Sequence, residues 1–181
     1  MGNSSHGEDL AMIQTVFEQL AQEQVKVRLL VIGGEPELEE NPPDWYTRLS
    51  IPQGIESYQS FVPWFRKVAE ECDLAIAPLV ANEFNQYKSP LKFLQYSAVG
   101  LSAIYSQVTP YQEVVTQGVD GILVDNDPEA WHQAIVQCLN QQDNLTKLAH
   151  AAQKKVREQY LMANFADAYV EIFARALSTI N

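Results

Sequence analysis

The sequence predicts a doubly wound α/β fold, in which helices cover both faces of a parallel sheet and give three layers. Short apolar, β-rich runs alternate with segments of helical periodicity, and the connections between them are short. The length of 181 residues fits one domain. We therefore treat residues 1–181 as a single unit and expect residues 1–7 to lie outside its ordered part.

The first part of the chain carries helix and strand signals in alternation. Glu8 and Asp9 stand at the start of a periodic segment, where a helix N-terminus favours negative charge. Gly33 and Gly34 close a compact apolar run, as a tight turn closes a buried strand. In order, we expect a helix over 8–23, a strand over 25–32, a polar loop over 35–48, a weak strand over 55–58, a helix over 62–72 and a strand over 73–79.

The second part has well-marked helix boundaries. Ser89 is expected to be the N-cap of a helix with Pro90 at its first position, and Gly100 follows its end. Asp127 and Pro128 begin another helix in the same way. In order, we expect a helix over 89–99, a strand over 101–105, a short helix over 111–116, a strand over 121–124 and three helices. The apolar positions of the first of these three helices are Trp131, Ala134, Ile135, Cys138 and Leu139, those of the second are Leu145, Leu148, Ala152 and Val156, and those of the third are Phe165, Tyr169, Ile172 and Phe173.

Charge and composition exclude several functions. The net charge is −11, from 23 acidic and 12 basic residues, which disfavours nucleic acid as a partner but leaves a small anionic ligand possible. No apolar run is long enough to span a membrane, and the N-terminus lacks the features of a signal peptide, so we expect a cytoplasmic protein without a transmembrane segment. Cys72 and Cys138 are expected in the core. The scattered His6, His132 and His150 predict no metal site.

The loop before the helix at 89–99 is the candidate binding site. In an open parallel sheet, ligands bind beyond the carboxyl ends of the strands, and this loop follows the strand at 73–79. Free amides in the first helical turn, with Lys88 beside them, favour a phosphate or diphosphate, and Gln95 is placed to meet a sugar hydroxyl. The alternative is that Lys88, Lys92 and Gln95 are the solvated face of a surface helix.

A family resemblance supports the ligand. Its segments occur in one order: HGEDL at 6–10, VIGG at 31–34, DLAIAPL at 73–79, EFN at 83–85, KS at 88–89, KFLQYSAVG at 92–100, PYQEVV at 110–115, GVDGILV at 118–124 and Trp131. From His6 to about Phe173 the chain resembles the C-terminal, Rossmann-like domain of retaining group 1 glycosyltransferases, which have the GT-B fold. The resemblance implies that the domain binds a nucleotide-sugar donor, which is a substrate, and it implies no cofactor or metal.

The resemblance also implies roles for individual residues. Lys88 would stabilise the diphosphate, and Glu83 would serve the sugar. The family places glutamates at the positions of Tyr87 and Gln95, and the second of these binds the ribose hydroxyls. The full set implied for donor binding is Ser89, Pro90, Leu91, Gln95, Tyr87, Asn85, Gly33 and Gly34.

The resemblance further implies partners. The acceptor-binding N-terminal half of such an enzyme is absent from this chain, so the fragment alone is expected to be inactive. The family's first strand, which is central in the sheet, also lacks a counterpart here. Its absence would leave two unpaired strand edges, and we expect the isolated chain to form a homodimer that covers them.

Two other functional classes remain open. In the first, the domain has lost its donor site, given Tyr87 and Gln95, and acts as a non-catalytic scaffold or interaction module. In the second, it is an unrelated dinucleotide-binding domain. We disfavour the latter because no Gly-x-Gly-x-x-Gly follows any predicted strand.

Overall fold

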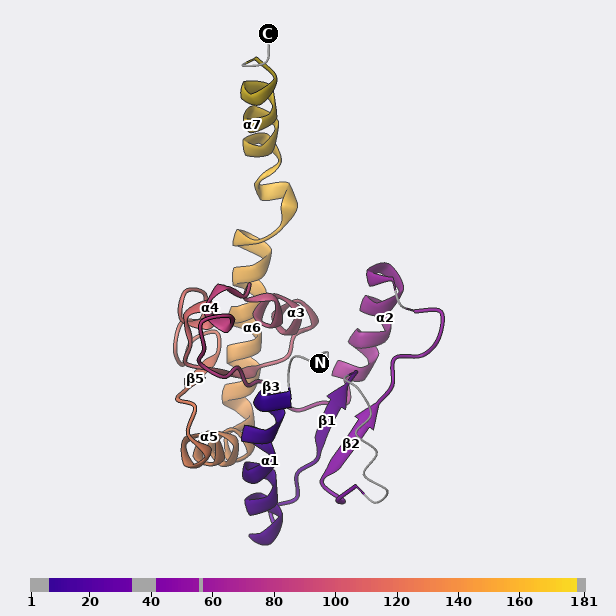
Figure 1. Cartoon of the computed structure of the whole chain (residues 1–181), viewed down its shortest axis with the longest axis vertical. Coiled ribbons are helices and arrows are strands. Elements are labelled where there is room, and N and C mark those ends of the chain that lie inside the picture. The colour runs from indigo at the N-terminus through magenta and orange to yellow at the C-terminus, as the bar shows by residue number, and fades with distance from the viewer. Residues whose placement is uncertain (1–6, 34–41, 56, 179–181) are drawn as a thin grey trace.

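The computed structural model describes residues 7–33, 42–55 and 57–178, and helices alternate with short strands along most of this range (Figure 1). The prediction that residues 1–7 lie outside the ordered domain falls, apart from Gly7, on residues outside the described ranges. The elements are α1 (Gly7–Gln22), β1 (Leu29–Ile32), β2 (Tyr46–Leu49), α2 (Tyr58–Ala69), β3 (Ala75–Ala77), the 3₁₀ turn η2 (Asn85–Tyr87), α3 (Leu91–Val99), β4 (Ala103–Ser106), α4 (Thr109–Gln112), β5 (Ile122–Val124), α5 (Pro128–Asn140), α6 (Gln142–Gln159), the 3₁₀ turn η3 (Met162–Asn164) and α7 (Ala166–Ser178).

All strand pairs in the described chain are parallel, as the sequence predicts, but they form two sheets. β3, β4 and β5 make one sheet in that order, with Ala75 opposite Ala103 and Ile104 opposite Ile122. β1 and β2 make a separate pair, with Leu29 opposite Tyr46.

Two apolar clusters cover the two faces of the larger sheet. On β4, Ala103 and Tyr105 belong to one cluster, together with side chains of α2, α3 and α4. Ile104 lies between them in sequence and belongs to the other cluster, together with side chains of α1 and α5. Because neighbouring residues of a strand point to opposite faces, this division places helices on both sides of the sheet. The three-layer, doubly wound α/β fold is therefore confirmed.

β1 and β3 each have one edge that pairs with no other described strand. β1 pairs only with β2, and β3 pairs only with β4. Both strands line a single cavity of about 2060 Å³, together with apolar side chains such as Phe17 from α1 and Trp64 from α2. Figure 1 shows β1, β2 and α2 grouped beside the rest of the molecule. The strands thus form two separate sheets, divided between the unpaired edge of β1 and the unpaired edge of β3.

The strand predicted over 55–58 is wrong. The strand is β2, Tyr46–Leu49, inside the segment assigned to a polar loop, and Tyr58 instead begins α2, which Ser57 caps by accepting a hydrogen bond from the amide of Ser60 at 3.2 Å. The charged Arg48 makes this segment resemble a polar loop in the sequence. In the structure its Nε donates a hydrogen bond to the carbonyl of Gly33 at 3.2 Å. Each residue of β2 is half-buried, so its apolar pattern is weak.

Two other predicted boundaries shift. β1 covers only the last four residues of the run predicted as strand 25–32, and α4 lies at Thr109–Gln112, earlier than the helix predicted over 111–116. In α4, Pro110 occupies a first-turn position, where its missing amide costs no helical hydrogen bond. The capped start of α5 at Asp127 is confirmed, because its carboxylate accepts from the amide of Ala130 at 2.9 Å.

The C-terminal helix α7 extends away from the body of the molecule in Figure 1. Its apolar side chains Tyr169, Ile172 and Phe173, which were expected to pack on one face, are exposed. None of the described helices is both long enough and apolar enough to cross a membrane. Of the two cysteines, Cys138 is buried and Cys72 is half-buried, and both are free thiols.

Candidate functional site

The first turn of α3 presents uncapped amides. Pro90, not Ser89, is the N-cap residue, so the predicted serine cap is wrong. Pro90 has φ −76° and ψ 38°, which is not helical, and the helix therefore begins at Leu91. A proline N-cap has no side-chain acceptor, and the amides of Leu91, Lys92 and Phe93 receive no capping hydrogen bond from a described side chain. Such amides, at the positive end of the helix dipole, favour a bound anion.

Lys88 stands immediately before these amides with its charge buried. Its Nζ atom has almost no solvent contact and makes no hydrogen bond to any described residue. The ammonium lies 5.2 Å from the ring centroid of Phe84, a weak interaction that leaves its three donors unused. A buried ammonium without hydrogen bonds is costly, and an anionic ligand would remove that cost.

These groups open into the cavity between the two sheets. Its wall includes the start of α1, the residues after β3 and the start of α3, which are the positions where an open α/β sheet binds its ligands. At this end of the cavity the lining residues are Gly7, Asp9, Pro78, Leu79, Lys88, Ser89, Leu91, Lys92 and Tyr111.

A set of hydrogen bonds fixes the chain that leaves β3. The amide of Leu79 donates to Ser106 Oγ at 2.8 Å, and its carbonyl accepts from Asn126 Nδ2 at 2.8 Å. The amide of Val80 donates to Asp9 Oδ1 at 2.6 Å, and its carbonyl accepts from Asn85 Nδ2 at 2.7 Å. Four side chains from separate segments thus satisfy the N–H and C=O groups of two consecutive residues, which fixes the backbone beside the cavity.

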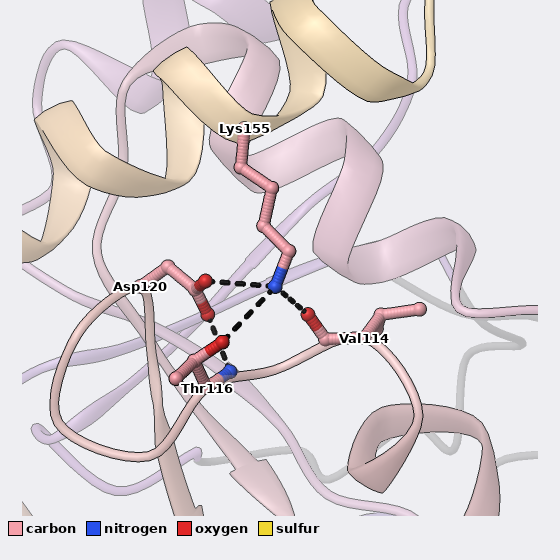
Figure 2. Close-up of polar contacts among 4 residues, drawn as sticks. All are labelled: Val114, Thr116, Asp120 and Lys155. Carbon is pink, nitrogen blue, oxygen red and sulfur yellow. Dashed lines mark hydrogen bonds and ion pairs between the residues drawn. The ribbon is translucent and has the colours of Figure 1, made fainter.

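A largely buried ion pair joins α6 to the segment between α4 and β5. Figure 2 shows Lys155 of α6 reaching Asp120, Thr116 and Val114, all in the segment between α4 and β5. Its Nζ lies 2.8 Å from Asp120 Oδ2 and 3.2 Å from Thr116 Oγ1, and it also donates to the carbonyl of Val114. The same ammonium lies 5.6 Å from the ring centroid of Phe93, on α3. Lys155 therefore links α6 to the helix that carries the candidate site.

The structure brings together only part of the set predicted from sequence. Lys88, Ser89 and Leu91 line the cavity, and Pro90 caps the helix between them. Asn85 is buried and its side-chain amide is committed to Val80, so it shapes the loop.

The remaining predicted residues lie elsewhere. Glu83 is exposed, and Tyr87 is 81% exposed. Gln95 is half-buried one turn further along α3, and none of these three lines the cavity. Gly33 has φ 76°, a conformation that favours glycine, while Gly34 lies outside the described residues.

Sequence reasoning missed two charged residues of this site. Asp9 was interpreted as a helix-dipole charge, but it is only 3% exposed and bonded across the fold to Val80. Lys92 was given no role in the predicted site, but it lines the cavity, and its pKa is lowered to about 8, above all because burial penalises the charged form. No group of three or more His, Cys, Asp or Glu within the described ranges is arranged to hold a metal ion.

The fold and site define a doubly wound α/β domain in which an uncapped helix start borders a large cleft. The profile of a family described as "Glycosyl transferases group 1" matches residues 3–141. The chain belongs to this family. No curated protein matches the sequence.

Several solved structures share the fold. HepE from Anabaena, in complex with UDP and glucose, superposes with a TM-score of 0.69 at 12% identity, over 91% of this chain and 44% of that one. TarM gives 0.68 at 13% identity, over 91% and 32% of the two chains, and sucrose-phosphate synthase from Thermosynechococcus elongatus gives 0.66 at 13%, over 91% and 42%. This chain therefore spans less than half the length of each of these structures. The predicted identity as a C-terminal GT-B domain is confirmed at the level of fold and family.

Proposed function

We propose that this chain is the donor-binding domain of a retaining glycosyltransferase that moves a hexose-type sugar from a nucleoside diphosphate to a saccharide or lipid-linked acceptor. The observation that carries the proposal is the buried Nζ of Lys88, without a hydrogen bond to any described residue, beside the uncapped start of α3. The complexes of Anabaena HepE contain UDP-glucose, or UDP and glucose, which are ligands of this class.

The chemistry follows from where negative charge grows during transfer. As the glycosidic bond to the donor breaks, the diphosphate leaves with the bonding electrons, and fixed positive groups next to it lower the barrier. The amides of Leu91, Lys92 and Phe93 and the ammonium of Lys88 are the groups proposed to take this part. The amides are held in place by α3 before the ligand arrives, so they need little reorganisation during the reaction.

Other residues are proposed to position the donor. Gln95 would meet the ribose hydroxyls, Glu83 the sugar, and Gly33 and Gly34 would allow the backbone to approach the ligand closely. Asn85 would act indirectly, because its side chain already binds Val80. Tyr87 is exposed enough to cover a bound nucleotide.

The rest of the active site is proposed to come from a longer parent protein. An acceptor-binding domain would precede this chain, and the fragment alone would bind the donor without turnover. The open edges of β1 and β3 and the exposed apolar side chains of α7 are surfaces that such a partner would cover. We place the parent enzyme in cytoplasmic polysaccharide biosynthesis. Reading the coding region upstream of Met1 tests this: a second α/β domain there is expected.

In isolation, two copies are proposed to pair through the same open edges. Exposed strand edges and apolar surface both favour association. Light scattering over a range of protein concentrations is expected to give a dimer, and a monodisperse monomer throughout would refute this part of the proposal.

Isothermal titration calorimetry with UDP, GDP, ADP and dTDP, alone and as their sugar conjugates, tests the donor site. At least one nucleotide is expected to bind, and Lys88→Ala is expected to weaken it about tenfold or more, as loss of a charge-assisted contact does. Lys147→Ala is the matched control, because Lys147 is an exposed lysine of α6 away from the cavity. It should bind like the unmodified chain.

The same titration distinguishes the proposed donor-binding domain from a second candidate, a scaffold that has lost its donor site. That candidate rests on Tyr87 and Gln95, where the family places carboxylates. Absence of binding across the whole panel would favour it and reject the donor site.

A further inference from the structure

Lys92 follows Lys88 by four residues and lines the same cavity. It is the second residue of α3, and both lysines contribute to the cavity wall. Asp9, at the start of α1, lines the wall with them, and its carboxylate is held by the amide of Val80 at 2.6 Å. Three charged side chains from two helices and a loop therefore meet beside the uncapped amides of α3.

The charges around Lys92 do not balance. Burial lowers the pKa of Lys92 to about 8, the charge of Lys88 lowers it in the same sense, and Asp9 opposes both. Of the described residues, Tyr96 and Tyr111 also line the cavity, and burial raises the pKa of both hydroxyls, so they stay neutral. One carboxylate, fixed by a backbone bond, thus faces two lysines.

We propose that Lys92 is the second ammonium of the diphosphate site, and that it takes up a proton from solvent as the nucleotide binds. The inference rests on the proposed function, because it assigns a residue of the same site. A fully solvated lysine on a helix face would not line the cavity. Lys92 lines it and is half-buried, and an entering diphosphate supplies a negative charge beside its ammonium.

The sign of the pH effect follows directly. Below pH 8 Lys92 is already mostly protonated, so nucleotide binding takes up only a small fraction of a proton. Above pH 8 the free protein holds Lys92 mostly neutral, so the ligand must bring in a proton and its affinity falls as the pH rises. From pH 7 to pH 9 the loss attributable to Lys92 is about tenfold, because roughly a tenth of a lysine with a pKa near 8 is protonated at pH 9.

The experiment compares Lys92→Arg with Lys92→Met. Arginine keeps its charge throughout this pH range, whereas methionine has a similar apolar stem and no charge. Titration with UDP, or with whichever nucleoside diphosphate of the panel binds most tightly, is run at pH 7 and pH 9 in two buffers of different ionisation enthalpy. The unmodified chain should take up close to one proton at pH 9, Lys92→Arg should bind without that uptake, and Lys92→Met should bind about tenfold more weakly at pH 7.

The two proposals fail differently. If Lys92→Met binds as tightly as the unmodified chain while Lys88→Ala does not, the role of Lys92 is refuted and the donor site stands. Equal proton uptake by the unmodified chain and Lys92→Arg also refutes it, because the proton must then go elsewhere. If no nucleotide binds any of the chains, both the donor site and the inference are refuted. Circular dichroism of each variant confirms that it is folded.

Discussion

Replacing Lys155 with methionine should destabilise the domain by about 3 kcal/mol. The side chain of Lys155 is 19% exposed and that of its partner Asp120 only 5% exposed, so the pair is largely desolvated. Methionine keeps the apolar stem but removes the ammonium, and it takes away the Lys155 donor from Asp120 Oδ2 and from the Val114 carbonyl. Removing one partner of a buried pair costs about 3 to 5 kcal/mol, and the remaining water contact of Lys155 places this case at the lower end.

The magnitude can be checked against the whole stability of the domain. Domains are stable by about 5 to 15 kcal/mol, so the change removes roughly a fifth to three fifths of it. With a urea m-value of about 2 kcal/mol/M, the unfolding midpoint should fall by about 1.5 M. Asp120 keeps a second bond, from the amide of Thr116 to Oδ1 at 2.7 Å, which limits the loss.

Urea unfolding followed by circular dichroism is the assay, with Lys154→Met as the control. Lys154 is the preceding residue of α6, its side chain is 74% exposed, and its ion pair with Glu158 is long, at 3.9 Å. Such a surface pair contributes about 0.5 kcal/mol or less. A double-mutant cycle with Asp120→Asn should give a coupling energy of about 2 kcal/mol. If Lys155→Met cost no more than Lys154→Met, the ion pair would not hold the loop and the reasoning would be refuted.

Three further changes test the fold and the site. Gly121→Ala should cost about 1 to 3 kcal/mol in urea unfolding, because its Cβ would lie 2.9 Å from both Tyr105 and Val115; an unchanged midpoint would contradict the packing. Gln95→Glu should tighten nucleotide binding in calorimetry about tenfold, since a carboxylate accepts ribose hydroxyls with charge assistance, and equal or weaker binding would remove Gln95 from the site. Lys92→Met should stabilise the free domain by about 1.5 to 3 kcal/mol at pH 7, because it removes a charge whose burial lowers the pKa to about 8. The unfolded chain holds more protons between pH 8 and about 10.5, so this gain should shrink as the pH rises through that window, and a gain that grew would refute the assignment.

Local signals predicted the helices well. The left-handed Gly100 after α3 and the aspartate cap of α5 act within a few residues, so their sequence patterns carry the information. The strands were harder, because β2 gains its place from pairing with β1 rather than from an apolar run of its own.

The depth of a side chain was not predictable from the pattern. Lys92 and Asp9 look like ordinary surface positions of two helices, and only the tertiary packing places them in one cavity wall. Lys88 was found because it precedes a helix start, which is a local signal. The predicted serine cap is wrong because Pro90 has ψ 38°, outside the helical range, so Leu91 is the first helical residue.

The division of the sheet has a thermodynamic consequence. Cooperative melting requires that each part of a domain lose stabilising contacts when the others unfold, and backbone bonds across a sheet are one coupling of this kind. Between β1 and β3 the described chain has no such bonds, so apolar packing alone couples the two parts. Heating the chain alone should therefore release the β1–β2–α2 part before the remainder, as a first, low-enthalpy transition in calorimetry, and a ligand that contacts only α3 should raise the second transition alone.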